Sequence, residues 1–192
     1  MRSSGRRLTL SPIGFDIVLA LSQAPDGLRL ADLAHIIGSP VSSVQTALRI
    51  LISNKLVERS SGEPPRYALA SDHPARQELA SLATVLPDAA HAIGVILRAN
   101  PSVRYAGVDS LGFLVAERPD DAAAGAALDR HLGLIADARP EAPSLVRMSE
   151  DEFGRLARVA LGLRDRARSA LTIKGRLPAG LRGEDSEAAS AG

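Results

Sequence analysis

The stretch from residue 41 to residue 54 carries hydroxyl, amide and guanidinium side chains on one flank of a helical spacing: Ser42, Ser43, Gln45, Thr46 and Arg49. The apolar residues of the same stretch recur at the three- and four-residue intervals of a helix and form a separate stripe: Val41, Val44, Leu48, Leu51 and Ile52. Core packing does not require polar groups on the outer side of a helix. Because these groups donate and accept hydrogen bonds, the flank is equipped to contact a polar partner.

Local signals predict the elements that position this flank. Ser11-Pro12 is typical of a helix start, and Gly38 suits the left-handed position that ends a helix. A turn cluster rich in Ser, Gly and Pro separates two strand-like runs and so predicts a hairpin. The expected order is helix, short strand, helix, helix and hairpin, at residues 11–23, 28–30, 31–37, 40–54, 56–59 and 66–69.

The stretches LADLAHIIGSPVSSVQTALRILISNKLVERS and RYALA carry this order, and they resemble the winged-helix DNA-binding domains of the MarR and IclR regulators. The resemblance covers Pro12 to Ala70. It implies that the third helix lies in the DNA major groove, where short side chains let the backbone approach base edges and phosphates. Gln45 suits adenine, and Arg49 suits guanine or a phosphate. The residues expected to read bases are Ser42, Ser43, Gln45, Thr46 and Arg49.

Basic residues near the hairpin and at the N-terminus are expected to contact the DNA backbone: Arg2, Arg6, Arg7, Arg59 and Arg66. Two other interpretations stay open. The polar flank of the third helix is solvated without a partner, or the winged helix binds protein instead of DNA.

Composition limits the remaining classes of function. Net charge is +1 over 192 residues, so any basic surface is local. Cysteine is absent, which excludes disulfides and thiolate metal sites, and no two of the four histidines have ligand spacing. We therefore expect surface or capping histidines, no metal and no cofactor. No window approaches the length of a membrane span and no leader is evident, so we expect a cytoplasmic, nucleoid-associated protein.

The second half of the chain has the alternation of an α+β domain. Helices are expected at 76–85 and 87–99, strands at 103–107 and 111–116, a helix at 120–135, a strand at 144–148 and a last strand at 171–173. Ser149 with Glu152 forms a capping box. It opens a helix whose apolar side is Phe153, Leu156, Val159, Ala160 and Leu163. The predicted organisation is a flexible basic arm (1–10), a winged helix (11–70), a linker (71–76), an α+β domain (77–175) and a disordered tail (176–192).

The pieces RYALASDHPARQEL, ANPSVRYAGVDS, LGFLVAERPDD and SLVRMSEDEFGRL resemble the minimal nucleotidyltransferase domain that some prokaryotic proteins carry after a winged helix. That family uses a Gly-Ser turn and a pair of Asp residues that hold Mg²⁺. Here the turn falls near Gly107-Val108, the Asp pair falls near Ser110 and Gly112, and Asp109 is the one carboxylate nearby. One carboxylate makes a poor Mg²⁺ site for phosphoryl transfer, so we expect a degenerate domain that is not an enzyme. The alternative is an unrelated α+β dimerisation or sensor domain.

A basic cluster near the C-terminus is either a second nucleic-acid or phosphate surface or a solvated face: Arg155, Arg158, Arg164, Arg166, Arg168, Lys174 and Arg176. Together these patterns predict a sequence-specific, double-stranded DNA-binding transcriptional regulator. We expect a homodimer with an unknown small-molecule effector or protein partner. The alternatives are a Mg-dependent nucleotidyltransferase with a winged-helix adaptor, and an antitoxin-like DNA-binding interaction protein.

Overall fold

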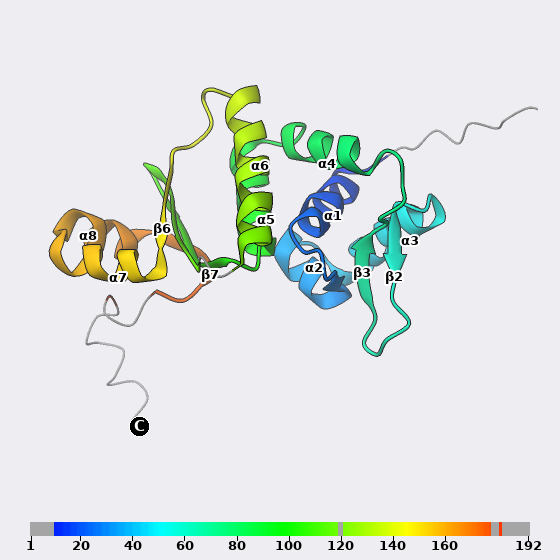
Figure 1. Cartoon of the computed structure of the whole chain (residues 1–192), viewed down its shortest axis with the longest axis horizontal. Helices are drawn as coiled ribbons and strands as arrows, with labels where there is room; N and C mark the ends of the chain where they lie inside the picture. Colours follow the sequence, from blue (N-terminus) through cyan, green and yellow to red (C-terminus); the bar gives the residue numbers. More distant parts are fainter. Residues whose placement is uncertain (1–9, 119–120, 178–180, 182–192) are drawn as a thin grey trace, which may run out of the picture.

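The computed structural model of the protein describes residues 10–118, 121–177 and 181. Figure 1 shows two parts side by side, one of helices with a small sheet and one with helices on both faces of a larger sheet. This mixture confirms the predicted α+β class. All of the predicted basic arm except Leu10, and most of the predicted tail, lie outside the described residues.

The first part has the predicted element order: α1 (Pro12–Ser22), β1 (Leu28–Arg29), α2 (Leu30–Ile37), α3 (Val41–Ser53), β2 (Val57–Arg59) and β3 (Arg66–Leu69). The strands form an antiparallel sheet in the order β1-β3-β2. The Ser11 hydroxyl caps α1 by accepting the amide hydrogen of Gly14 at 3.2 Å. Gly38 ends α2 with a φ of 71°, a left-handed conformation that glycine adopts without steric cost. Both local signals therefore act as predicted.

The second part contains α4 (Arg76–Val85), α5 (Ala89–Ala99), β4 (Val103–Asp109), β5 (Gly112–Glu117), α6 (Ala122–Ala138), β6 (Leu145–Ser149), α7 (Glu150–Val159), α8 (Leu161–Ser169) and β7 (Leu171–Gly175). Its sheet has the order β6-β5-β4-β7. A tight turn joins the antiparallel strands β4 and β5, whereas β5 and β6 are parallel and α6 connects them. Strand β7 returns antiparallel to β4.

Helices cover both faces of this sheet (Figure 1). Helix α5 packs on one face together with α6, and α7 with α8 packs on the other. On the α7 side, Tyr105 and Phe153 are buried with ring centroids 5.6 Å apart. Leu181, which is 1% exposed, and Leu177 pack on the same cluster. The described end of the chain thus contributes to the second core.

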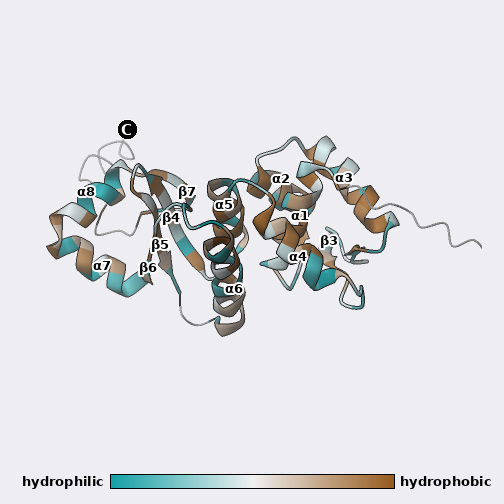
Figure 2. Cartoon of the chain, turned by 90° about the horizontal axis from the view of Figure 1, so that it is seen from above, coloured by the Kyte–Doolittle hydropathy of each residue, from teal (hydrophilic) through white to brown (hydrophobic). Residues whose placement is uncertain are grey.

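A single apolar core joins the two parts. Helix α1 packs directly on α4 and α5, and the cluster continues from α2 and α3 to β4, β5 and α6. Figure 2 shows apolar residues concentrated along α1 and α5, where the parts meet. Polar groups also cross this junction: the buried Asn100 amide donates to Gln23 Oε1 at 3.0 Å, and Nε of the half-buried Arg98 donates to the Ile36 carbonyl at 2.6 Å. The first part is therefore packed on the second through a continuous core and hydrogen bonds.

Two details of the predicted helices are wrong, and His131, expected at the surface or as a cap, is 3% exposed. In α3, Val41 and Ile52 are exposed, because the buried stripe centres on Val44 and Leu51 and includes Ala47 in their place. The helix that follows Ser149 does not run through to Leu163. It breaks at Ala160, whose extended backbone separates α7 from α8. The predicted N-cap does form, since the Ser149 hydroxyl accepts the Glu152 amide hydrogen at 3.1 Å.

Within the described residues, no single helix is long and apolar enough to cross a membrane. Helices α2 and α3 reach that length and apolarity only as a pair, and they are bent by 111° where they meet.

Candidate nucleic-acid interface

Helix α3 turns one stripe to the core and leaves the opposite flank open. The stripe packs on α1, α2 and β2, and Val44 and Leu51 are fully buried. The structure brings all five predicted base-reading residues onto the outer side of this one helix: Ser42, Ser43, Gln45, Thr46 and Arg49. Ser43 is half-buried, and the other four are exposed. Figure 1 places α3 at the end of the molecule away from the larger sheet.

The hydrogen bonds on this flank leave its functional groups available. Thr46 Oγ1 donates to the Ser42 carbonyl at 2.9 Å, so the Thr46 hydroxyl presents a lone pair and its methyl group outward. Within the described part of the chain, the side chains of Gln45 and Arg49 have neither a hydrogen bond nor an ion pair. They lie one turn apart on the same side of the helix. The amide and the guanidinium can therefore reach one external partner together.

The start of α3 borders an open groove. This groove, of about 420 Å³, lies between α3 and the first turn of α1, and its lining includes Ser11, Ile13, Ser42 and Ser43. No side chain caps the N-terminus of α3. The first amide hydrogens of a helix lack intrahelical acceptors and favour anions such as phosphate. The groove thus combines hydroxyl and amide donors at the N-terminal end of α3.

Sequence reasoning missed one apolar member of this flank. Ile50 lies one turn beyond Thr46, is 46% exposed, and lines the same groove. An exposed aliphatic side chain beside polar groups is suited to the thymine methyl group. The signal was present in the sequence, because Ser42, Thr46 and Ile50 share an i, i+4 spacing on the side opposite Val44.

The hairpin places its arginines differently from one another. Arg59 is exposed at the end of β2, as expected for a backbone contact. The Arg66 guanidinium instead donates to the Gly27 carbonyl at 2.7 Å and so secures the turn that precedes β1. Arg29 was missed by the sequence analysis. Arg29 is exposed on β1. It lies in register with Arg66 because β1 pairs with β3 in the small sheet.

Three predicted backbone contacts, Arg2, Arg6 and Arg7, lie outside the described residues. A second overlooked cation is Lys55, which follows α3 with a φ of 59° and is exposed. The described cations on or beside α3 and the small sheet are Arg29, Arg49, Lys55, Arg59 and Arg66.

Helix α3, with its exposed polar flank, is thus followed directly by the β2–β3 hairpin. Residues 13–61 match the IclR helix-turn-helix domain. This match confirms the IclR part of the predicted resemblance and supports DNA as the partner of the helix-turn-helix domain. No curated protein and no solved structure matches the chain. The likeness of the second part to a nucleotidyltransferase stays a prediction.

In the second part, Asp109 is bound by the chain itself. Arg166 donates to both of its carboxylate oxygens, at 2.5 and 3.0 Å, and the Leu111 amide donates to one of them at 2.8 Å. The Arg166 hydrogen bonds hold the pKa of Asp109 below its ordinary value. Among the described residues, no group of three or more His, Cys, Asp or Glu side chains is arranged to hold a metal ion.

The basic cluster near the C-terminus is divided by internal contacts. Arg166 binds Asp109, Arg168 donates to the Leu181 carbonyl at 3.2 Å, and Lys174 donates to the Asn100 carbonyl. Burial lowers the pKa of Lys174 to about 8. These three cations therefore act within the fold, while Arg155 and Arg158 on α7 are exposed.

Proposed function

We propose that the protein is a sequence-specific transcriptional regulator that binds double-stranded DNA. The observation that carries this proposal is the open flank of α3, where Gln45 and Arg49 have no partner among the described residues and Thr46 is exposed beside them. A solvated flank without a partner is the alternative, and the match to a DNA-binding domain over residues 13–61 favours the interface.

In this proposal α3 enters the major groove and its side chains divide the reading of the site. Gln45 pairs with adenine, Arg49 with guanine, and Ile50 contacts a thymine methyl group. Ser42, Ser43 and Thr46 hydrogen-bond base edges, and the uncapped start of α3 binds a phosphate. Arg59 and Arg29 contact the backbone from the small sheet. Arg66 supports the interface indirectly, because its guanidinium holds the turn at Gly27.

Selection from random duplexes with the full chain, followed by fluorescence anisotropy at defined salt, tests the proposal. Replacing Arg49 with Ala is expected to cost about 1–3 kcal/mol of binding and to relax the preference at one base pair. Arg59→Ala is expected to weaken all sequences alike and to lower the salt slope by about 1. The matched control is Arg104→Ala, at an exposed position of β4. Equal affinity of the parent and Arg49→Ala for the selected site refutes the assigned role of α3.

We further propose that the chain acts as a homodimer, since two-fold symmetric sites require two reading helices. The junction of α7 and α8 supports this, because Val159 and Leu161 expose 78% and 67% of their surfaces there. Sedimentation analysis tests it: Val159→Ser with Leu161→Ser is expected to give monomers, and a parent chain that is already monomeric at the concentrations that bind DNA contradicts it.

The second part is proposed to be a non-catalytic domain for dimerisation or for sensing a ligand or partner. The bidentate contact between Arg166 and Asp109 supports this view, because it engages the carboxylate nearest the expected metal position. Incubating the chain with Mg²⁺ and each labelled nucleotide tests the enzyme alternative. Transfer of label to protein or RNA would overturn the non-catalytic assignment.

A further inference from the structure

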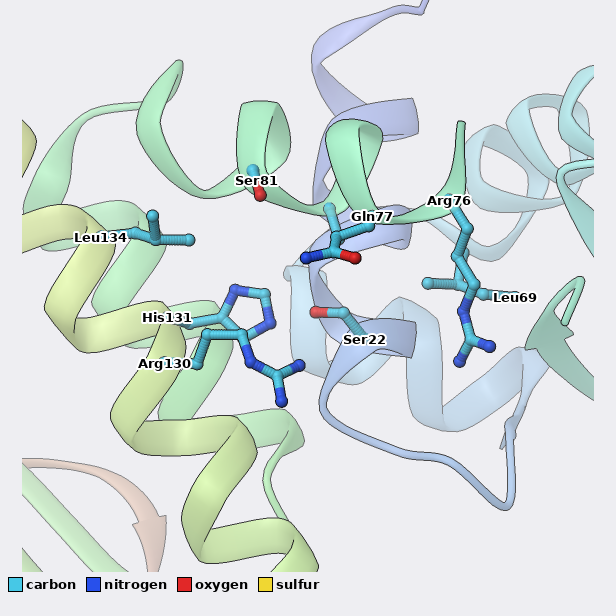
Figure 3. A pocket seen from close by; sticks show the side chains of 9 residues that line it. Ser22, Leu69, Arg76, Gln77, Ser81, Arg130, His131 and Leu134 are labelled. Atoms are coloured by element: carbon cyan, nitrogen blue, oxygen red, sulfur yellow. The ribbon is translucent and has the colours of Figure 1, made fainter. Parts of the chain in front are cut away.

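A cavity lies between the helix-turn-helix domain and the second part of the chain. Its volume is about 340 Å³, near the lower end of the range for small-molecule sites. Its walls come from α1, β3, α4 and α6: Ser22, Leu69, Arg76, Gln77, Ala80, Ser81, Arg130, His131 and Leu134. Figure 3 shows Arg76 and Arg130 on opposite sides of this cavity, with Gln77 and Ser22 between them.

The charge of the cavity is positive and unbalanced. None of its lining residues is an acid. Within the described ranges, the side chains of Arg76 and Arg130 have neither a hydrogen bond nor an ion pair. Asp129, the neighbour of Arg130, is bound by Arg147 at 2.5 Å. Two guanidinium groups that line a small cavity without a carboxylate favour an anionic ligand.

His131 adds an acceptor at the base of this cavity. The Thr84 hydroxyl donates its one proton to the Ala80 carbonyl at 2.8 Å, so the 2.7 Å contact between Thr84 Oγ1 and His131 Nδ1 requires a hydrogen on Nδ1. Burial, and secondarily the charge of Arg130, lowers the pKa of His131 to about 4, so the ring is neutral at pH 7. Its Nε2 therefore carries a lone pair. Figure 3 shows this nitrogen on the side that faces Ser22.

Ser22 is a second acceptor. Its hydroxyl donates to the Leu19 carbonyl at 2.7 Å and accepts from the Gln23 side-chain amide at 3.4 Å, so one lone pair remains for a ligand. We propose that the cavity binds a small organic anion that also carries a hydroxyl group. Arg76 and Arg130 bind the anionic group, and the ligand hydroxyl donates to His131 Nε2. Carboxylates and phosphate esters share this chemistry.

The position of the cavity suggests what occupancy does, and this step rests on the proposed function. Ser22 and Leu69 belong to α1 and β3, whereas Arg76 and Arg130 belong to α4 and α6. A bound anion contacts both parts at once, and it changes DNA affinity to the extent that it binds the free and DNA-bound states differently.

Isothermal titration calorimetry of the full chain tests the site with malate and glycerol 3-phosphate. Succinate is the matched probe that lacks the hydroxyl group of malate. Glycerol is the matched probe that lacks the phosphate of glycerol 3-phosphate. We expect malate to bind more tightly than succinate, and glycerol not to bind. Arg76→Gln and Arg130→Gln are each expected to weaken anion binding by about tenfold, whereas Arg104→Gln, at an exposed position of β4, is expected to leave the affinity for the anion unchanged.

Absence of heat with both hydroxylated anions overturns the proposal, and so does equal affinity in the two cavity variants and the parent. Equal binding of malate and succinate overturns the role of His131. Anisotropy with the selected duplex, with and without the tighter anion, then tests the coupling. Identical DNA affinity overturns it. Failure of the chain to bind any duplex refutes the proposed function. Calorimetry tests anion binding in the cavity without DNA, so the two failures can be distinguished.

Discussion

Acidification is expected to destabilise this protein through His131, which the fold buries as a neutral imidazole. His131 is 3% exposed, and its Nδ1 is bound to Thr84 at 2.7 Å. In the unfolded chain the imidazole takes up a proton near pH 6.5. In the native state its pKa falls to about 4, mainly because burial penalises the charged form. Between these two pH values the unfolded state binds more protons, so the free energy of unfolding decreases as the pH falls.

The size of the effect follows from the two pKa values. Lowering the pKa from 6.5 to about 4 corresponds to about 3 kcal/mol, at about 1.4 kcal/mol for each pH unit. The contribution of His131 to the free energy of unfolding is fully present above pH 6.5. It declines between pH 6.5 and about pH 4, and no more is lost from this group at lower pH. A loss of this size is a large fraction of the roughly 5–15 kcal/mol that stabilises a domain.

Urea unfolding followed by circular dichroism between pH 4 and pH 7.5 measures this, since the chain has no tryptophan. The informative variant is His131→Asn, whose amide keeps a donor near the position of Nδ1 and does not titrate. We expect its stability to fall less steeply with acid than that of the parent. His35→Asn, at an exposed position of α2, is the matched control. Parallel curves for the parent and His131→Asn would refute the buried neutral imidazole.

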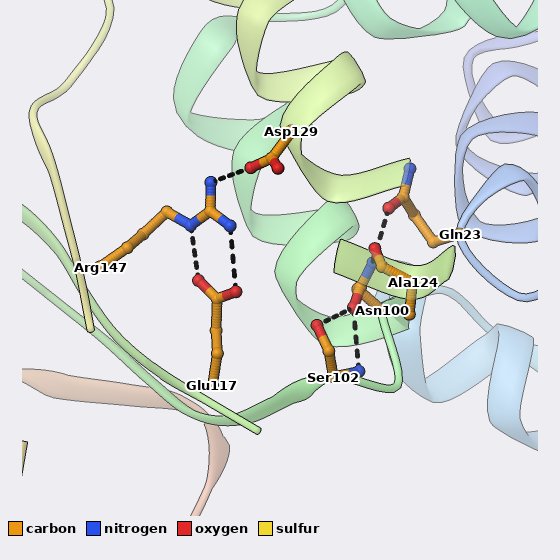
Figure 4. Close-up of polar contacts among 7 residues, drawn as sticks. All are labelled: Gln23, Asn100, Ser102, Glu117, Ala124, Asp129 and Arg147. Atoms are coloured by element: carbon orange, nitrogen blue, oxygen red, sulfur yellow. Dashed lines mark hydrogen bonds and ion pairs between the residues drawn. The ribbon is translucent and has the colours of Figure 1, made fainter. Parts of the chain in front are cut away.

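Three further predictions concern glycines and buried polar contacts. Gly38→Ala is expected to cost about 1–2 kcal/mol in thermal unfolding because φ is 71°, whereas Gly133→Ala within α6, where nothing lies within 4 Å of a new Cβ, is expected to add about 1 kcal/mol. Asn100→Asp replaces a fully buried amide that donates to Gln23 and Ala124 (Figure 4). In denaturant unfolding, the free energy of unfolding is expected to fall by more than about 2 kcal/mol, and a smaller decrease would contradict the role of these bonds. Arg147→Gln leaves Glu117, 15% exposed in its side chain, without its bidentate partner and is expected to cost about 1–3 kcal/mol, with exposed Arg155→Gln as the control.

The sequence predicted the elements of the helix-turn-helix domain because their signals are local. Ser11-Pro12 begins α1, Gly38 ends α2, and the turn cluster separates β2 from β3. The same locality explains why the exposed flank of α3 was found. The stripe of α3 was less accurate, since Val41 and Ile52 are apolar by type but lie on its solvent side.

Contacts between distant residues could not be predicted in this way. His131 was expected at the surface, and it is buried because α4 folds over α6 and brings Thr84 to its ring. The hydrogen bond from Arg66 to a carbonyl 39 residues away was not foreseen, and its predicted contact with the DNA backbone stays a prediction. Arg166 and Asp109 are 57 residues apart in the chain, so composition showed only a basic cluster and a lone acid. Each of these pairings depends on tertiary packing.

If two copies of the chain bind DNA as proposed, the shared core of α1, α4 and α5 fixes how each helix-turn-helix domain is oriented on the rest of its copy. A reading head on a flexible tether tolerates variable distances between half-sites, because the tether adjusts. Here the helix-turn-helix domain shares one core with the second part of the chain. The proposed dimer would therefore accept only one distance between half-sites. Inserting about five base pairs, half of a turn of about 10.5, would rotate one half-site to the opposite side of the duplex and allow only one copy to engage.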